Sequence, residues 1–315
     1  MKTILVPIDG SSLSETALPI AFAIARRRGA AGVETVTVSA PALDPLRIGS
    51  APVRDTRLDH DRLAWDKALV ESLGERLAAM SGGMPTRATL LEGDAAERIA
   101  AQLKGGDYEL VVMTTHGRSG ASRMWLGSVA DRLVRMSPVP VLLLRDLSSA
   151  TPLEEEALFG DVLIPIASYE EFDESEVILS DALALAGDQA TYHLLTVVSQ
   201  AHLLPPPSAL DVATASAAAR AYAPSPDLLD ATRDAATRSL HEVARRLRER
   251  GVRVTTHVVV HDSPAGGILE YAHAIDARLI AMASHGRGPA RRALLGSVTD
   301  KVVRGAAVPV LVYVP

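Results

Sequence analysis

Two segments of the chain share a pattern of glycine and serine that suits the binding of an anion. In each, a glycine follows an apolar run, and after nine further residues a Gly-Ser pair precedes an amphipathic stretch. A glycine-rich loop between a strand and a helix allows several backbone N–H groups to converge on a phosphate at the helix start. The candidate phosphate contacts are Gly117, Gly127, Ser128 and Val129 in the first segment and Gly286, Gly296 and Ser297 in the second.

The same residues also have a plainer interpretation, which the sequence leaves open. A glycine after a strand often only permits a turn, and a Gly-Ser pair often only begins a helix. The chain has no Gly-Lys-Ser/Thr sequence, and neither loop follows the first strand, so a P-loop and the usual dinucleotide fingerprint are excluded. His116 and His285 lie inside the loops without a nucleophile, second base or metal ligand at a recognisable spacing, so we interpret them as turn residues.

The repetition extends to the elements that must position these loops. Strand-like apolar runs open the two copies at 4–8 and 162–166, and others close them at 139–144 and 308–313. Between them, apolar runs alternate with helical periodicity, as in the stretch from Leu13 to Ala25 that follows the first strand. Pro19 within this stretch predicts a kink or a late start of the helix, and Gly29 and Gly32 predict its end. This alternation predicts an α/β protein made of two tandem, doubly wound domains, each with a five-stranded parallel sheet covered by helices on both faces.

We expect the first domain at 1–146 and the second at 160–315, joined by a polar, acidic linker. The second copy is longer than the first, and its extra residues fall near 203–227, a Pro- and Ala-rich stretch that we interpret as a loop. In such sheets a ligand binds beyond the carboxyl ends of the strands, where the strand order reverses.

The composition excludes several classes of protein. The 315 residues include no cysteine, so disulfides and zinc–thiolate sites are excluded. No apolar run approaches the roughly 18 residues of a membrane helix, and the apolar N-terminal run is broken at Pro7, too early for a signal peptide. A net charge of −6 argues against non-specific nucleic-acid binding. We therefore expect a cytoplasmic protein that binds neither membrane nor nucleic acid.

The first strand with Asp9, the loop spacing and the Pro-Val-Leu-rich final strands together resemble the universal stress protein family over nearly the whole chain. The match is to a tandem, two-domain member similar to the ATP-binding subgroup. The resemblance implies a Rossmann-like fold of adenine-nucleotide-binding type, with ATP, ADP or AMP as ligand and Mg²⁺ as a companion ion. Family members pair, often through their last strands, so we also expect the two domains to pair through 139–144 and 308–313, and a homodimer.

The resemblance assigns roles to residues of the first copy. Asp9 matches the aspartate that holds the ribose hydroxyls, Val38 a backbone contact to adenine, and Met113 a contact to sugar and base. Thr114 stands where the family motif has its first glycine, and a β-branched residue there limits how closely the ligand approaches. The expected cofactor-binding residues of this copy are Pro7, Asp9, Val38, Met113, Thr114, Gly117, Gly127, Ser128 and Val129.

The second copy departs further from the family pattern. Ala283 replaces the first glycine, and Ala167 stands where the first copy has Asp9. Alanine cannot accept a hydrogen bond from ribose, and losing a charged hydrogen bond of roughly 1.5–3 kcal/mol weakens binding by roughly tenfold to a hundredfold. We therefore predict ATP binding in the first copy and weak or no binding in the second. The matching residues of the second copy are Val197, Met282, Gly286, Gly296, Ser297 and Val298.

Three functions remain open on this basis. The first is a stress-response protein that acts as a nucleotide-dependent sensor or binding module and is not an efficient enzyme. The second is a slow, Mg²⁺-dependent ATP hydrolase, although the sequence offers no general base or water-positioning residue for it. The third is an interaction protein in which neither site holds a nucleotide. The sequence identifies no catalytic residue and no metal ligand.

Overall fold

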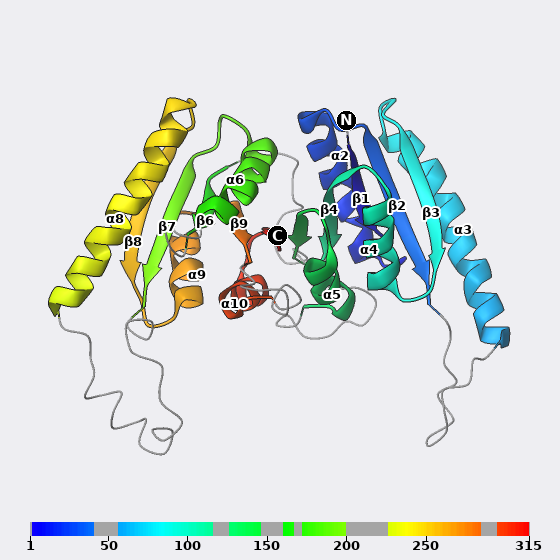
Figure 1. Ribbon diagram of the computed structural model, residues 1–315. Coiled ribbons are helices and arrows are strands. Elements are labelled where there is room, and N and C mark those ends of the chain that lie inside the picture. The colour runs from blue at the N-terminus through cyan, green and yellow to red at the C-terminus, as the bar shows by residue number, and fades with distance from the viewer. Residues whose placement is uncertain are drawn as a thin grey trace, which may run out of the picture. The chain divides into compact units, whose positions relative to one another are not determined.

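The structure, a computed structural model, describes residues 2–40, 56–115, 126–145, 160–166, 172–199, 226–284 and 295–314. Within these residues, ten strands alternate with helices along the chain (Figure 1). The predicted α/β class is therefore confirmed. The chain divides into two compact units: the first contains residues up to 158 with 283–296 and 307–315, and the second contains 159–282 with 297–306.

The first unit is built around a sheet with the strand order β3-β2-β1-β4-β5-β10. Its strands are β1 (Thr3–Pro7), β2 (Gly32–Ser39), β3 (Thr86–Glu92), β4 (Tyr108–Thr114), β5 (Val141–Leu144) and β10 (Val310–Tyr313). Neighbouring strands are parallel, except that β10 pairs antiparallel with β5 and places Val312 opposite Val141. The chain winds outward to β3 and then returns to β4 on the other side of β1. This reversal makes the carboxyl ends of β1 and β4 the expected place for a ligand.

Helices cover both faces of this sheet (Figure 1). They are α1 (Ser12–Glu15), α2 (Ala17–Arg28), α3 (Thr56–Met80), α4 (Ala95–Gly105) and α5 (Ser128–Met136). Right-handed crossovers place α2 and α3 on one face and α4 and α5 on the other, because the chain reverses direction across the sheet after β3. The start of α4 and the start of α5 thus both lie beside the carboxyl ends of β1 and β4.

The helix expected from Leu13 to Ala25 is two helices, because the chain turns at Thr16. The Thr16 N–H and hydroxyl both donate to the carbonyl of Leu13, at 3.1 and 2.7 Å, which closes a tight turn. Pro19 then lies in the first turn of α2, where a missing N–H costs no helical hydrogen bond. The predicted end of the helix at Gly29 is confirmed: its φ of 63° is left-handed, and its N–H donates to Ala25.

The second unit repeats the pattern with the strand order β9-β6-β7-β8. Its strands are β6 (Val162–Pro165), β7 (Tyr192–Val198), β8 (Val254–Val260) and β9 (Leu279–Ala283), and its helices are α6 (Phe172–Ala186), α8 (Pro226–Glu249), α9 (Pro264–Ala274) and α10 (Ser297–Gly305). The pairs β6–β7, β6–β9 and β7–β8 are all parallel. Nearly all of the expected loop at 203–227 lies outside the described residues, and α8 begins where that stretch ends.

The central strands of the first unit are buried on both faces, as their continuous apolar sequence predicts. Ile4, Leu5 and Val6 of β1 have no exposed surface, and neither do the three residues of β4 at 110–112. The edge strand β3 is only half-buried. The strands that end at the reversal point are therefore fully enclosed, and they provide a rigid base for side chains at their carboxyl ends.

A buried carboxylate ties the sheet together at the opposite, amino end. Glu34 of β2 is 5% exposed and accepts hydrogen bonds from Tyr108 Oη at 2.9 Å, Gln102 Nε2 at 3.1 Å and Thr89 Oγ1 at 2.8 Å. Burial, and then the hydrogen bond to Glu34, raise the pKa of Tyr108. Because every donor to this carboxylate comes from a different element, the group links β2 to β3, β4 and α4.

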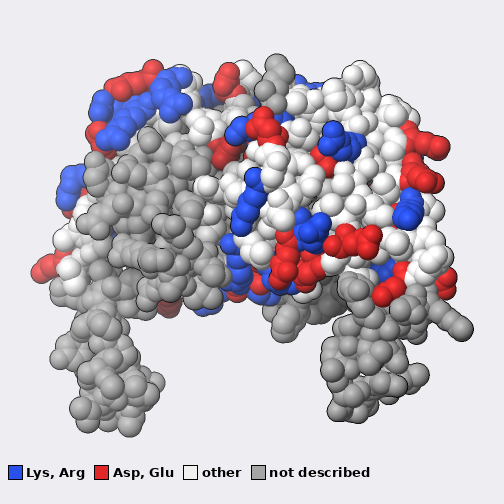
Figure 2. Space-filling model, turned by 45° about the vertical axis from the view of Figure 1, so that its right-hand side comes forward, with Lys and Arg blue, Asp and Glu red and all other residues white. Residues whose placement is uncertain are grey.

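Charged side chains of both signs are interspersed over the described residues of the face in Figure 2. Such mixing does not create a broad field of one sign on that face. None of the helices in the described ranges is long and apolar enough to cross a membrane.

Candidate functional site

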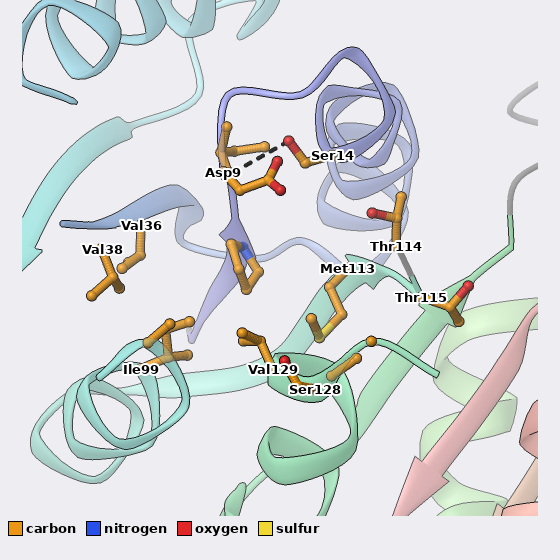
Figure 3. A pocket seen from close by; sticks show the side chains of 15 residues that line it. Asp9, Ser14, Val36, Val38, Ile99, Met113, Thr114, Thr115, Ser128 and Val129 are labelled. Atoms are coloured by element: carbon orange, nitrogen blue, oxygen red, sulfur yellow. Dashed lines mark hydrogen bonds between the residues drawn. The ribbon is translucent and has the colours of Figure 1, made fainter. Parts of the chain in front are cut away.

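A cleft of about 280 Å³ lies at the carboxyl ends of β1 and β4 in the first unit (Figure 3). It is bounded by the ends of β1, β2 and β4 and by the first turns of α4 and α5. Eight of the nine cofactor-binding residues expected in the first copy line it: Pro7, Asp9, Val38, Met113, Thr114, Gly127, Ser128 and Val129. The ninth, Gly117, lies outside the described residues. The structure thus brings the candidate residues together, and their contact with a nucleotide stays a prediction.

Seven further residues line the cleft that the sequence interpretation did not name: Ile8, Ser14, Val36, Ala95, Ile99, Thr115 and Ala130. For three of these residues, the spacing in the sequence is a recognisable signal. Val36 precedes Val38 by two residues, which is the spacing of side chains on one face of a strand. Ala95 and Ile99 are four residues apart and share one face of a helix. That this helix would border the cleft depends on the strand order, which the sequence alone does not state.

The cleft has an apolar wall and a polar wall. Val36 and Val38 of β2 face Ile99 of α4 across one end, as Figure 3 shows. Asp9 and Thr114 lie toward the other end. Such a site fits a ligand with a flat apolar ring at one end and hydroxyl or anionic groups at the other.

Asp9 is held by the turn that follows it. Its Oδ1 accepts hydrogen bonds from the Ser11 N–H at 3.0 Å and the Ser11 hydroxyl at 2.6 Å. Its own N–H donates to Ser14 Oγ at 3.3 Å, the bond drawn in Figure 3. The carboxylate therefore reaches the cleft in a fixed orientation rather than as a freely rotating side chain.

The start of α5 has the geometry of an anion site. Gly127 is its N-cap and provides no side-chain hydrogen bond to the helix. The Gly127 N–H itself donates to the carbonyl of Thr115 at 2.7 Å, which joins the helix start to the end of β4. Because no side chain caps this helix, the N–H groups of its first turn, at Ser128 and Val129, are suited to an anionic ligand.

An ion-paired arginine joins the two helices that border the cleft. Arg132 of α5 donates to Asp94 Oδ2 at 2.6 Å and to Glu97 Oε1 at 3.0 Å. Asp94 is also the N-cap of α4, and its side chain accepts from the Glu97 N–H at 3.0 Å. The hydrogen bond from Arg132, and then the one from Glu97, lower the pKa of Asp94. The contact fixes the first turn of α4 beside α5.

The candidate residues of the second copy lie on corresponding elements. Val197 is in β7 and Met282 in β9, and Ser297 and Val298 are the first residues of α10. The N–H of Gly296 donates to Ser284 Oγ at 2.9 Å, whereas its counterpart Gly127 donates to a backbone carbonyl. Gly286, Ala167, His116 and His285 lie outside the described residues, so the difference between the two sites stays a prediction.

The described parts of the chain hold no cluster of three histidine, aspartate or glutamate side chains that could bind a metal. Parallel sheets, helices on both faces and a cleft at the reversal of strand order define a Rossmann-like α/β protein. The sequence profile of the universal stress protein family matches this chain twice, at residues 1–145 and 160–314. The chain belongs to this family and carries two of its domains in tandem.

Individual relatives agree with this assignment. The chain is 34% identical over 146 residues to Universal stress protein Rv2005c of Mycobacterium tuberculosis, a match that covers 45% of each chain, so it spans about half the length of that relative. It is 32% identical over 144 residues to a universal stress protein of Thermus aquaticus, covering 46% of this chain and 98% of the relative. The crystal structure of a universal stress protein from Archaeoglobus fulgidus has a TM-score of 0.67 at 19% identity, covers 99% of this chain and 97% of its own, and shares the fold.

Proposed function

We propose that the cleft of the first unit binds an adenine nucleotide, ATP or its products ADP and AMP. The observation that carries the proposal is the combination in one cleft of an apolar wall, a fixed carboxylate and an uncapped helix start. The protein acts as a nucleotide-dependent sensor or binding module in the cytoplasmic stress response. Adenine fits the apolar wall, the ribose hydroxyls donate to Asp9, and the phosphates accept from the first turn of α5.

Mg²⁺ would accompany the phosphates and supply positive charge to them. Asp9 is the one carboxylate in the described lining of the cleft, and its proposed task is the ribose. A magnesium ion in this cleft would therefore be held mainly by phosphate oxygens and water, which is how this ion often binds beside nucleotides. Hydrolysis is not part of the proposal, because no described lining residue other than Asp9 has the basic character needed to activate water.

The proposal includes two domains, at 1–146 and 160–315, that pair through their last strands. What supports the pairing is the antiparallel register of β10 with β5 inside the first unit, where Val310 lies opposite Leu143. A second copy of the chain would then complete a homodimer. Light scattering and crosslinking in solution test that last step.

The direct test is the nucleotide content of the purified protein. Denaturing it and separating the released compounds should give AMP, ADP or ATP, and calorimetry on the emptied protein should give about one tight site per chain. Asp9→Ala should weaken ATP binding by about tenfold to a hundredfold, because a charged hydrogen bond is lost. The matched control is Asp107→Ala, an exposed carboxylate at the amino end of β4, which should not change the affinity.

Two results would contradict parts of the proposal. If the wild-type protein neither contains nor binds an adenine nucleotide, the first unit is an interaction module and the proposed ligand is wrong. If calorimetry finds two equal, tight sites per chain, the ligand stands but the predicted weakness of the second copy is wrong.

A further inference from the structure

Ser11 makes two hydrogen bonds to one oxygen of Asp9, the only carboxylate in the described lining of the cleft. Its hydroxyl also accepts from the Ser14 N–H at 3.1 Å. Ser14 in turn donates its hydroxyl proton to the Ser11 carbonyl at 2.9 Å and accepts from the Asp9 N–H at 3.3 Å. The three residues thus form a closed group of hydrogen bonds at the end of β1.

The direction of each hydrogen bond in this group follows from the number of protons. The Ser14 N–H can only donate, so Ser11 Oγ must accept from it and is left with its own proton to donate. That proton points at Asp9 Oδ1, 2.6 Å away, which accepts it. The Asp9 N–H likewise donates to Ser14 Oγ, whose proton goes to the Ser11 carbonyl.

This arrangement restricts how the Asp9 side chain can rotate. Ser11 holds Oδ1 through both its backbone and its hydroxyl, so the plane of the carboxylate and the direction of Oδ2 are set by the turn. Removing the Ser11 hydroxyl would take away the shorter of the two bonds that Ser11 makes to Oδ1, at 2.6 Å against 3.0 Å, and would leave the orientation of the carboxylate less restricted. A hydroxyl of the ligand would then meet an acceptor in several orientations instead of one.

We propose that Ser11 is a positioning residue that gives the cleft its preference for ribose over 2′-deoxyribose, by fixing Asp9. The inference rests on the proposed binding of adenine nucleotides in this cleft. Ser11 acts through Asp9 rather than by touching the ligand, since Asp9 and Ser14 line the cleft and Ser11 does not. The second copy has Tyr169 at the position that corresponds to Ser11 and Ala167 at that of Asp9, so it lacks both members of the pair.

A purely structural role for Ser11 predicts a different outcome. Ser11 is also the N-cap of α1, because its side chain accepts from the Ser14 N–H. If capping were its whole contribution, removing the hydroxyl would lower the stability of the protein and weaken the binding of every nucleotide by the same factor. Positioning of Asp9 predicts instead that only ligands with a 2′-hydroxyl lose affinity. The ratio of the two affinities therefore separates the roles.

The experiment is a calorimetric titration of the emptied protein with ATP and with 2′-deoxy-ATP. The wild type should prefer ATP by about tenfold to a hundredfold, the value of one hydrogen bond to a charged acceptor. In Ser11→Ala this preference should fall to about threefold or less, mainly through weaker ATP binding. Ser11→Thr retains the hydroxyl and should restore the preference. Ser11→Gly, which is well tolerated as an N-cap, is the second variant if the alanine protein does not fold.

Thr16→Ala is the matched control. Thr16 closes the same α1–α2 turn, and its hydroxyl and N–H donate to Leu13 rather than to Asp9, so its variant should keep the wild-type preference. If Ser11→Ala and Ser11→Gly both discriminate as well as the wild type, the inference is wrong while the proposed function stands. If the wild type binds neither nucleotide, both the inference about Ser11 and the proposed function are wrong. If the Ser11 variants bind both nucleotides more weakly by the same factor, Ser11 has the capping role alone and the inference is wrong.

Discussion

The hydroxyl of Thr255 lies 3.0 Å from Nδ1 of His193, and it also lies 3.1 Å from Nε2 of His257. One hydroxyl has a single proton, so it donates to one ring and accepts from the other. On the other side of its ring, Nε2 of His193 lies 3.4 Å from Oδ2 of Asp161. The two rings stack at 5.9 Å, and the ring of Tyr271 lies 4.9 Å from His257. This group joins β7, β8 and α9 in the second unit.

The group should make the second unit sensitive to acid. Burial, and then the charge of the nearby His193, lower the pKa of His257. The folded state therefore binds the His257 proton less readily than the unfolded state, whose histidine pKa is about 6.5. The stability this supplies is complete above that value and is lost as the pH falls through the lower, folded pKa. Thermal unfolding from pH 8 to pH 5 should show a smaller loss in His257→Gln than in the wild type.

His241→Gln on the exposed face of α8 is the control for this prediction, because it removes a histidine from the same unit without touching the group. Its thermal stability should fall between pH 8 and pH 5 by as much as that of the wild type. If the His257→Gln protein also loses as much thermal stability between pH 8 and pH 5 as the wild type does, the group does not govern acid stability.

Replacing two glycines of the first unit by alanine should change its stability in opposite directions. A Cβ at Gly32, the first residue of β2, would overlap the backbone carbonyl oxygen of Pro85, which cannot move without shifting β3. Gly32→Ala should therefore destabilise the unit by about 1–3 kcal/mol, the usual cost of overpacking. Gly74 lies inside α3 with nothing within 4 Å of its added Cβ. Gly74→Ala should stabilise by up to about 1 kcal/mol through helix propensity. Urea unfolding midpoints would check both, and shifts of the same sign would contradict the packing argument.

Ala95 tests the position of the apolar wall. It lies in the first turn of α4 and lines the cleft, so Ala95→Phe would place a ring where the base is proposed to lie. Nucleotide affinity should fall by about tenfold or more, as an overpacked site loses at least about 1.4 kcal/mol. Ala101→Phe, on the exposed side of the same helix, is the control and should bind as the wild type does. Unchanged binding in Ala95→Phe would place the base elsewhere.

Periodicity was enough to predict the elements, but the site needed information that periodicity does not contain. The alternation of apolar runs predicted the strands, and Asp9 and the Gly-Ser pair at Gly127 were recognisable from type and spacing. Ile99 is not predicted, because its place in the cleft depends on the chain returning through α4 from the edge strand β3 to β4, which pairs with β1. Pro19 predicts a kink or a late start of the first helix, but the exact place of the break, at Thr16, depends on a side-chain bond to Leu13 that competes there with the helix. Local patterns predict local structure, whereas the cleft depends on the order of the strands.

Asp94 should show two separable contributions at the start of α4. Asp94→Ala removes the N-cap and should lower the stability by about 1 kcal/mol at pH 7, whereas Asp94→Asn keeps an acceptor for the Glu97 N–H and should lower it less.

The charge of Asp94 makes the second contribution, which depends on pH. The hydrogen bond from Arg132 lowers the pKa of the carboxyl, so the stability that this group contributes is present above the unfolded pKa of about 4 and is lost as the pH falls through the folded pKa. Melting curves at pH 7 and pH 3 should therefore show a smaller acid loss in Asp94→Asn than in the wild type. Asp107→Asn, exposed in the connection between α4 and β4, should leave that loss unchanged. An equal cost of the alanine and asparagine variants at pH 7 would mean that the charge, and not the cap, holds α4 beside α5.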